Sequence, residues 1–346
     1  MNRSPRTVTF VVAAAAAFTA FCVAGCSLNS LQRNPALQAA AREANARARE
    51  QQQALARTAI AEAVRADNQG QTETAEKRLD EAVRIQGDDA NAYAFVGAAV
   101  TEQKRPLLAL RLLERGYQKP GGGRDDPLLL AALARAARQS GKTERAAEVE
   151  REASARAEAI LRADAGVGLR RTPEETARAA SRLLVVGAYF HEYAKNVPQA
   201  LKAWRAALAL LPNEPTLLNQ VGYTLADEGT TPAEWNEALD LTRRALAQAP
   251  NDAMIRDSYG WALYRVGDTK AARRVLREAA DALPDEPDAH YHLGVALAKL
   301  GLANEARAEF ARTLRLRPDH EKARKALAGL PAVPDEPAVA SSPGAG

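Results

Sequence analysis

Apolar and polar positions along the chain follow the pattern of helices. Alanine-rich runs are interrupted by Arg, Glu, Leu and Gln, all of which are strong helix formers. No stretch shows the Val- and Ile-rich alternation with a period of two that predicts strands. The pattern therefore predicts an all-α protein.

The apolar pattern repeats itself in the C-terminal third of the chain. Four small or helix-breaking residues recur at one offset of 34 residues. They are Gly260, Gly267, Ala272 and Pro284, matched by Gly294, Gly301, Ala306 and Pro318. In each copy the small residues allow two helices to pack closely, and a bulky residue, Leu276 or Phe310, fills the space between them. The second glycine ends the first helix of a copy, and the proline ends the second helix.

This order of residues resembles the tetratricopeptide repeat (TPR) family. The resemblance implies a right-handed α-solenoid of antiparallel helix pairs. Carrying the phase backwards predicts three degenerate units in 56–160 and four units at 181–214, 215–252, 253–286 and 287–320, with a linker at 161–180. Residues 321–330 are expected to form a capping helix, and the Pro-, Ala- and Ser-containing tail 331–346 is expected to be disordered.

The unit 215–252 carries an insertion of four residues. Ala238 follows Gly229 by nine positions, where the other units have five. Within the inserted segment, Thr231 and Pro232 have the pattern of a helix N-cap and a first helical residue. Trp235 beside them would either plug the edge of the repeat or form an exposed contact.

The N-terminus has the pattern of an export signal. Arg3 and Arg6 precede an apolar run that is too short for a comfortable membrane span, followed by small residues. The stretch VAGC, residues 23–26, resembles the lipobox of bacterial lipoproteins, which implies a signal peptide at 1–25 and lipidation of Cys26. An ordinary cleaved signal is the alternative. In lipobox families a serine such as Ser27 implies the outer membrane, and we expect 26–55 to be a tether or a loosely held helix.

Charge and candidate chemistry narrow the possible functions. Without Arg3 and Arg6 the chain has 45 basic residues (47 − 2) and 43 acidic residues, evenly mixed, so no basic stripe supports nucleic-acid binding. His191-Glu192 begins a zinc-protease motif, but Lys195 stands where the second histidine is required. His290 and His292 are two apart and point away from each other on a helix. We therefore expect no metal site, no cofactor and no enzyme activity.

The TPR resemblance also implies a concave groove lined by positions 2, 5, 9, 12 and 13 of each first helix. In the C-terminal units these positions include many aromatic residues, which suits recognition of a peptide or a helix. The predicted protein-binding residues are Tyr189, Tyr193, Asn219, Tyr223, Trp261, Tyr264, Arg265, Tyr291 and Lys299. Packing of these aromatic residues between repeats is the alternative. Arg265 and Lys299 are candidates to receive a terminal carboxylate, although the paired Lys and Asn set of the carboxylate-clamp subgroup is not present.

These features together predict a lipid-anchored, periplasm-facing scaffold that binds protein partners. GYTLAD (222–227) and DSYGWALYR (257–265), combined with the lipobox, are similar to lipoproteins that act as adaptors for periplasmic processing proteases. Assembly factors for pili, secretins or exopolysaccharide export have a similar build. A glycan- or peptidoglycan-binding protein, or an envelope enzyme, is the alternative of a different class.

Overall fold

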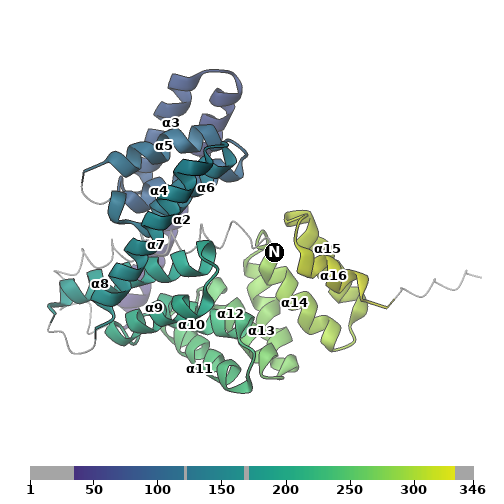
Figure 1. Cartoon of the computed structure of the whole chain (residues 1–346). Helices are drawn as coiled ribbons and strands as arrows, with labels where there is room; N and C mark the ends of the chain where they lie inside the picture. The colour runs from purple at the N-terminus through teal and green to yellow at the C-terminus, as the bar shows by residue number, and fades with distance from the viewer. Residues whose placement is uncertain (1–34, 121–122, 167–170, 332–346) are drawn as a thin grey trace, which may run out of the picture. The chain divides into compact units, whose positions relative to one another are not determined.

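The computed structural model describes residues 35–120, 123–166 and 171–331 (Figure 1). Over these ranges the chain forms fifteen α-helices, α2 to α16, with one short 3₁₀ helix, one π-helical turn and no strand. The prediction of an all-α fold is confirmed. The expected signal peptide 1–25, the lipidated Cys26 and all but the first residue of the expected tail 331–346 lie outside the described residues.

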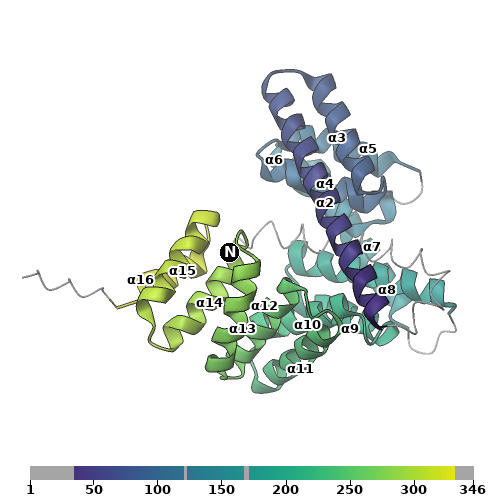
Figure 2. The ribbon, with the colours of Figure 1, turned by 180° about the vertical axis from the view of Figure 1, so that it is seen from behind.

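The chain divides into two compact units, and the first ends at Pro212. In unit 1 consecutive helices pack in pairs. The pairs are α2 (Pro35–Asn68) with α3 (Thr72–Gln86), α4 (Ala90–Glu102) with α5 (Pro106–Gln118), α6 (Pro127–Gln139) with α7 (Thr143–Asp164), and α8 (Pro173–Ala188) with α9 (Val197–Leu210). Figure 2 shows α2, the longest helix of the unit at 34 residues, from its uncovered side.

Unit 2, from Asn213, has the same plan. Its pairs are α10 (Pro215–Glu228) with α11 (Pro232–Gln248), α12 (Ala253–Arg265) with α13 (Thr269–Ala282), and α14 (Pro287–Lys299) with α15 (Ala303–Leu316). The first helices α10, α12 and α14 also contact one another in sequence and so form one face of the unit. The final helix α16 (Glu321–Ala328) packs on α15, within the range predicted for a capping helix.

Glycines at the helix crossings explain the repeated small residue. A Cβ atom on Gly260 would lie 2.7 Å from Leu276 Cγ, and one on Gly294 would lie 2.6 Å from Phe310 Cε1. Both distances are far below van der Waals contact, so only glycine lets these helices approach this closely. The glycine that follows each first helix has a different role, because Gly267 and Gly301 adopt positive φ angles of 95° and 77°.

The unit predicted at 181–214 differs from the others by one residue. A π-helical turn, Tyr189–Tyr193, follows α8 and inserts an extra residue into its last turn. As a result Gly187, and not the predicted Ala188, faces the bulky residue of the second helix, Trp204. For residues before this turn, the repeat position predicted from the 34-residue period is therefore wrong by one.

Two predicted boundaries also change. The linker expected at 161–180 is shorter, because α7 continues to Asp164 and α8 already begins at Pro173, where Thr172 and Glu175 form a capping box. The tether expected at 26–55 contains the start of α2, which is helical from Pro35. No described helix has both the length and the apolar character needed to cross a bilayer.

A candidate interaction surface on unit 2

An aromatic cluster joins the first helices of unit 2. The Trp261 ring stacks on Tyr264 at a centroid distance of 5.0 Å and on His292 at 4.4 Å, with interplanar angles of 11° and 18°. Tyr291 lies 6.4 Å from Trp261, and Tyr223 lies 6.2 Å from His292. The cluster thus includes side chains from α10, α12 and α14.

Each of these three helices also supplies a carboxylate to the same region. Asp257 Oδ2 lies 2.8 Å from His292 Nδ1, which makes a buried ion pair when the imidazole is protonated. Asp288 accepts two bonds from Arg317, at 2.9 and 3.0 Å, and lies 3.1 Å from Nε2 of His320.

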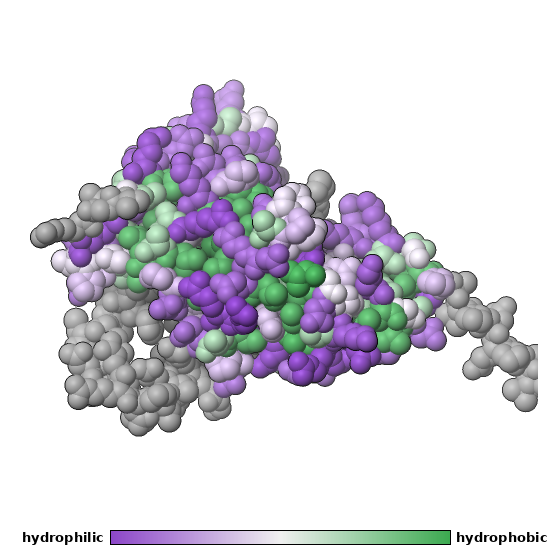
Figure 3. Space-filling view, turned by 90° about the horizontal axis from the view of Figure 1, so that it is seen from below, coloured by the Kyte–Doolittle hydropathy of each residue, from purple (hydrophilic) through white to green (hydrophobic). Residues whose placement is uncertain are grey.

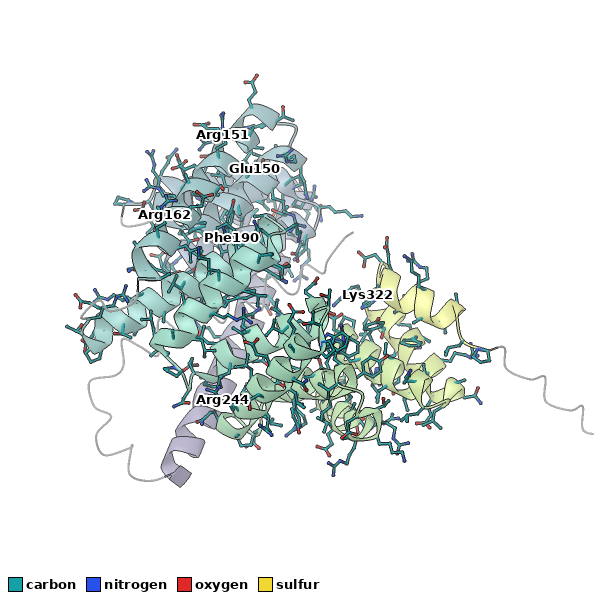
Figure 4. All side chains as sticks on the ribbon, turned by 60° about the horizontal axis from the view of Figure 1, so that its bottom comes forward. Glu150, Arg151, Arg162, Phe190, Arg244 and Lys322 are labelled. Atoms are coloured by element: carbon teal, nitrogen blue, oxygen red, sulfur yellow. The ribbon has the colours of Figure 1, made fainter. Side chains whose placement is uncertain are left out.

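Asp227 completes the set. It accepts from Lys322 Nζ at 3.2 and 3.4 Å, although the two residues are 95 positions apart. Figure 4 labels Lys322 on α16, turned toward the other helices of unit 2.

The carboxylates and the burial of the cluster shift its titrating groups. Burial, reinforced by Asp227, Asp288 and Asp257, raises the pKa of Tyr223 well above its ordinary value. Burial alone would lower the pKa of His292, but Asp257 and the other two aspartates outweigh it, so the pKa of His292 is raised. Burial opposes ionisation of Asp288 too, but His320 and Arg317 hold the pKa of Asp288 well below its ordinary value. The cluster is therefore acidic and aromatic, with each charge partly compensated.

Three buried polar atoms in this part of unit 2 have no hydrogen-bond partner among the described residues. They are Asn219 Oδ1, Asp257 Oδ1 and Trp261 Nε1, on side chains that are 7%, 4% and 5% exposed as residues. Leaving such a group unsatisfied costs about 1–3 kcal/mol each. Each of these atoms can take part in one further hydrogen bond.

The structure corrects the exposure that the sequence predicted for two groove residues. Trp261 is 5% exposed and Tyr189 is 6% exposed, so neither is a free aromatic contact. Tyr223, Tyr264 and Tyr291 are half-buried, Asn219 is buried, and Lys299 is exposed. The partly exposed rings, and not Trp261, are the aromatic groups available to a partner. In Figure 3 apolar residues appear in small groups between larger hydrophilic areas.

Arg265 is already engaged within the fold. Its Nη2 donates to the Gly229 carbonyl at 2.8 Å, and its guanidinium lies 4.8 Å from the centroid of the Trp235 ring. Trp235 Nε1 donates to the same carbonyl at 2.9 Å. Trp235 therefore plugs the edge of the repeat. Arg265 binds the inserted segment that leads into α11, so it is not free to bind a terminal carboxylate as predicted. Thr231 is the N-cap and Pro232 the first residue of α11, as predicted.

Tyr189 and Tyr193 belong to unit 1 and lie in the π-helical turn. Because this turn shifts the phase, Tyr189 does not occupy the inner position that the repeat assigned to it. Its ring packs edge-on against Phe190 at 5.4 Å, and burial raises its pKa. The two tyrosines are thus features of unit 1.

Several members of the cluster were not predicted from the sequence. Asp227 and Asp288 fall at positions 13 and 2 of their first helices, so the repeat phase alone could have found them. His292 falls at position 6, which is not one of the groove positions of the repeat. Lys322 belongs to the capping helix, to which the repeat pattern does not apply. Among the described residues no group of three or more His, Cys, Asp or Glu side chains could hold a metal ion.

Comparison with known proteins found one family and several solved structures. The tetratricopeptide repeat family matches residues 260–334. No curated protein matches the chain. Among solved structures, the APC/C hetero-tetramer Cut9–Hcn1 is similar over 72% of this chain and 44% of that chain, with 16% identity and a TM-score of 0.45.

Two other solved structures are also similar. YrrB, a TPR protein with an unusual peptide-binding site, is similar over 72% of this chain and 96% of its own, with 16% identity and a TM-score of 0.35. MamA is similar over 41% of this chain and 80% of its own, with 21% identity and a TM-score of 0.33. The described residues form an all-α array of helix pairs, and its C-terminal part matches the tetratricopeptide repeat family.

Proposed function

We propose that this TPR solenoid is a lipid-anchored scaffold of the outer membrane that faces the periplasm and binds protein partners through unit 2. The repeats supply the scaffold, since stacked helical repeats create extended concave surfaces that suit binding. The observation that carries the site is the cluster on α10, α12 and α14, where half-buried tyrosines lie beside buried polar atoms that have no partner. The lipobox VAGC supports the anchor and the compartment.

The partner is proposed to be a protein or peptide, in an adaptor role for a periplasmic protease or an envelope assembly complex. A peptide offers the hydrogen-bond donors and acceptors that the unpartnered polar atoms lack, together with side chains for the tyrosine rings. The histidine at the centre of the cluster, His292, is paired with Asp257 of the neighbouring first helix, and we assign it a structural role.

Capture of partners from envelope membranes tests this proposal. The tagged, lipidated protein is crosslinked in intact cells and its partners are identified, in parallel with a Tyr264→Ala, Tyr291→Ala variant. We expect the variant to lose the partners at unchanged helicity, because both rings are half-buried. Arg243→Ala is the matched control, since this side chain is 66% exposed on a second helix. Equal capture by all three proteins would refute binding at this surface, and binding to isolated cell wall without protein partners would refute the scaffold function.

A further inference from the structure

The three aspartates of the cluster are neutralised in different ways. Asp257 and Asp288 are paired with groups of the repeats and their last turn: His292 for the first, Arg317 and His320 for the second. Asp227 is paired with Lys322, which belongs to the capping helix α16. A cation from outside the repeats therefore completes the acidic cluster.

The Lys322 ion pair is the replaceable one. Its side chain is 62% exposed, whereas Arg317 is 14% exposed and His292 is 3% exposed. Ion pairs that are open to solvent contribute little, because water and salt screen them and the flexible lysine loses entropy. A competing cation can reach Asp227, which is itself 18% exposed, without unfolding a repeat.

Two of the buried atoms without a partner among the described residues can bind only hydrogen-bond donors. Asp257 Oδ1 and Asn219 Oδ1 are acceptors only, so they require N–H or O–H donors. Asp257 belongs to this cluster because its other oxygen is bound to His292, which stacks on Trp261. The third atom, Trp261 Nε1, is a donor and suits a peptide carbonyl.

We propose that this cluster is a subsite for a basic side chain of the protein partner, and that Lys322 occupies Asp227 until the partner displaces it. The subsite rests on the proposed function and specifies which side chain it reads. Arginine is the preferred ligand, because its five N–H donors can serve a carboxylate and a second acceptor together, while its planar group stacks on tyrosine. Lysine is the weaker ligand, with three donors on one nitrogen.

Short capped peptides test the subsite directly. The probe is acetyl-Gly-Ser-Arg-Ser-Gly-amide, compared with the same peptide carrying citrulline, which keeps the shape of arginine without its charge, or glutamate. Binding to the mature chain is followed by the indole N–H resonances of Trp204, Trp235 and Trp261, assigned by Trp→Phe variants. We expect the arginine peptide to shift the Trp261 signal at millimolar concentration and the citrulline and glutamate peptides to leave it unchanged.

Variants separate the two parts of the proposal. Lys322→Ala should tighten arginine-peptide binding about two- to sixfold, since it removes an internal competitor with the strength of an exposed ion pair. Asp227→Asn should weaken binding at least about fivefold. Asp240→Asn is the matched control: it removes an acidic side chain of the same unit on α11, which pairs with Arg243, and should change nothing.

The subsite is overturned if citrulline or glutamate peptides shift Trp261 equally, if no peptide shifts it, or if Lys322→Ala leaves the affinity unchanged. These results are distinct from failure of the scaffold function. Partners captured from membranes by the Asp227→Asn variant as well as by the unaltered protein would leave the scaffold intact and remove only this subsite.

Discussion

Substitution of Gly187 by alanine is the sharpest test of the helix packing in unit 1. A Cβ atom at this position would lie 2.1 Å from Trp204 Nε1 and 2.3 Å from its Cδ1. Normal contact requires about 3.5 Å, so the indole would have to retreat by about 1.4 Å. Trp204 is fully buried and its Nε1 donates to the Leu184 carbonyl at 3.1 Å, so the ring has little freedom to move.

The expected cost combines three effects. Overpacking a tight core costs about 1–3 kcal/mol, and a buried indole N–H that loses its acceptor costs about 1–3 kcal/mol more. Alanine recovers about 1 kcal/mol, because it is a better helix former than glycine. The free energy of unfolding should therefore fall by about 3 kcal/mol. Chemical denaturation followed by circular dichroism measures the loss, and hydrogen exchange in α8 and α9 locates it.

Two controls separate the contact from the substitution. Gly329→Ala should change the unfolding free energy by less than about 0.5 kcal/mol, because its nearest neighbours would lie at 3.5 and 3.7 Å. In a Trp204→Leu background, Gly187→Ala should be neutral or stabilising, since the obstructing ring is gone. If Gly187→Ala costs as much in that background as in the natural protein, the packing argument is wrong.

Three further predictions concern other parts of the chain. The pKa of His292 is raised, so the stability that this residue contributes is fully present below about pH 6.5 and is lost as the pH rises through its folded pKa. The loss of unfolding free energy caused by His292→Gln should therefore become smaller from pH 5 to pH 9. A loss that stays constant over this range would contradict the prediction. Thr231→Ala removes the N-cap of α11 and should lower the unfolding free energy by about 1 kcal/mol, whereas Ala in place of Thr230 should have no such effect in the same denaturation assay. Cys26→Ser should release the protein into the soluble fraction after fractionation of cells, and membrane retention would refute the lipid anchor.

The repeat phase predicted much of the fold because it rests on steric constraints. Glycine at the crossing positions of α12 and α14, and a positive φ at Gly267 and Gly301 after these helices, leave few alternatives to a helix pair. The extra residue at Tyr189–Tyr193 left no such trace, because a π-helical turn absorbs an insertion inside a helix without a Gly or Pro signal. For this reason Ala188 and Tyr189 do not have the repeat positions that the 34-residue period assigned to them.

The candidate site was harder to predict than the fold. Position 9 of α12 does point Trp261 toward the other first helices, but the phase cannot show that Tyr264 and His292 cover both faces of its ring. Arg265 likewise has a groove position, yet the inserted turn supplies it with the Gly229 carbonyl and the Trp235 ring. Burial of this kind depends on residues from neighbouring repeats, which a single-repeat pattern does not contain.

The contact between Lys322 and Asp227 also connects the last helix of unit 2 with its first helix pair. An array of repeats held only by nearest neighbours can fray from its last helix inward, one element at a time. A bond from α16 back to α10 spans 95 residues, so the cap contacts the first helix pair of the unit as well as its neighbour α15. A ligand that takes Asp227, as proposed above, would leave α16 held by α15 alone, and the amide protons of α16 should then exchange faster.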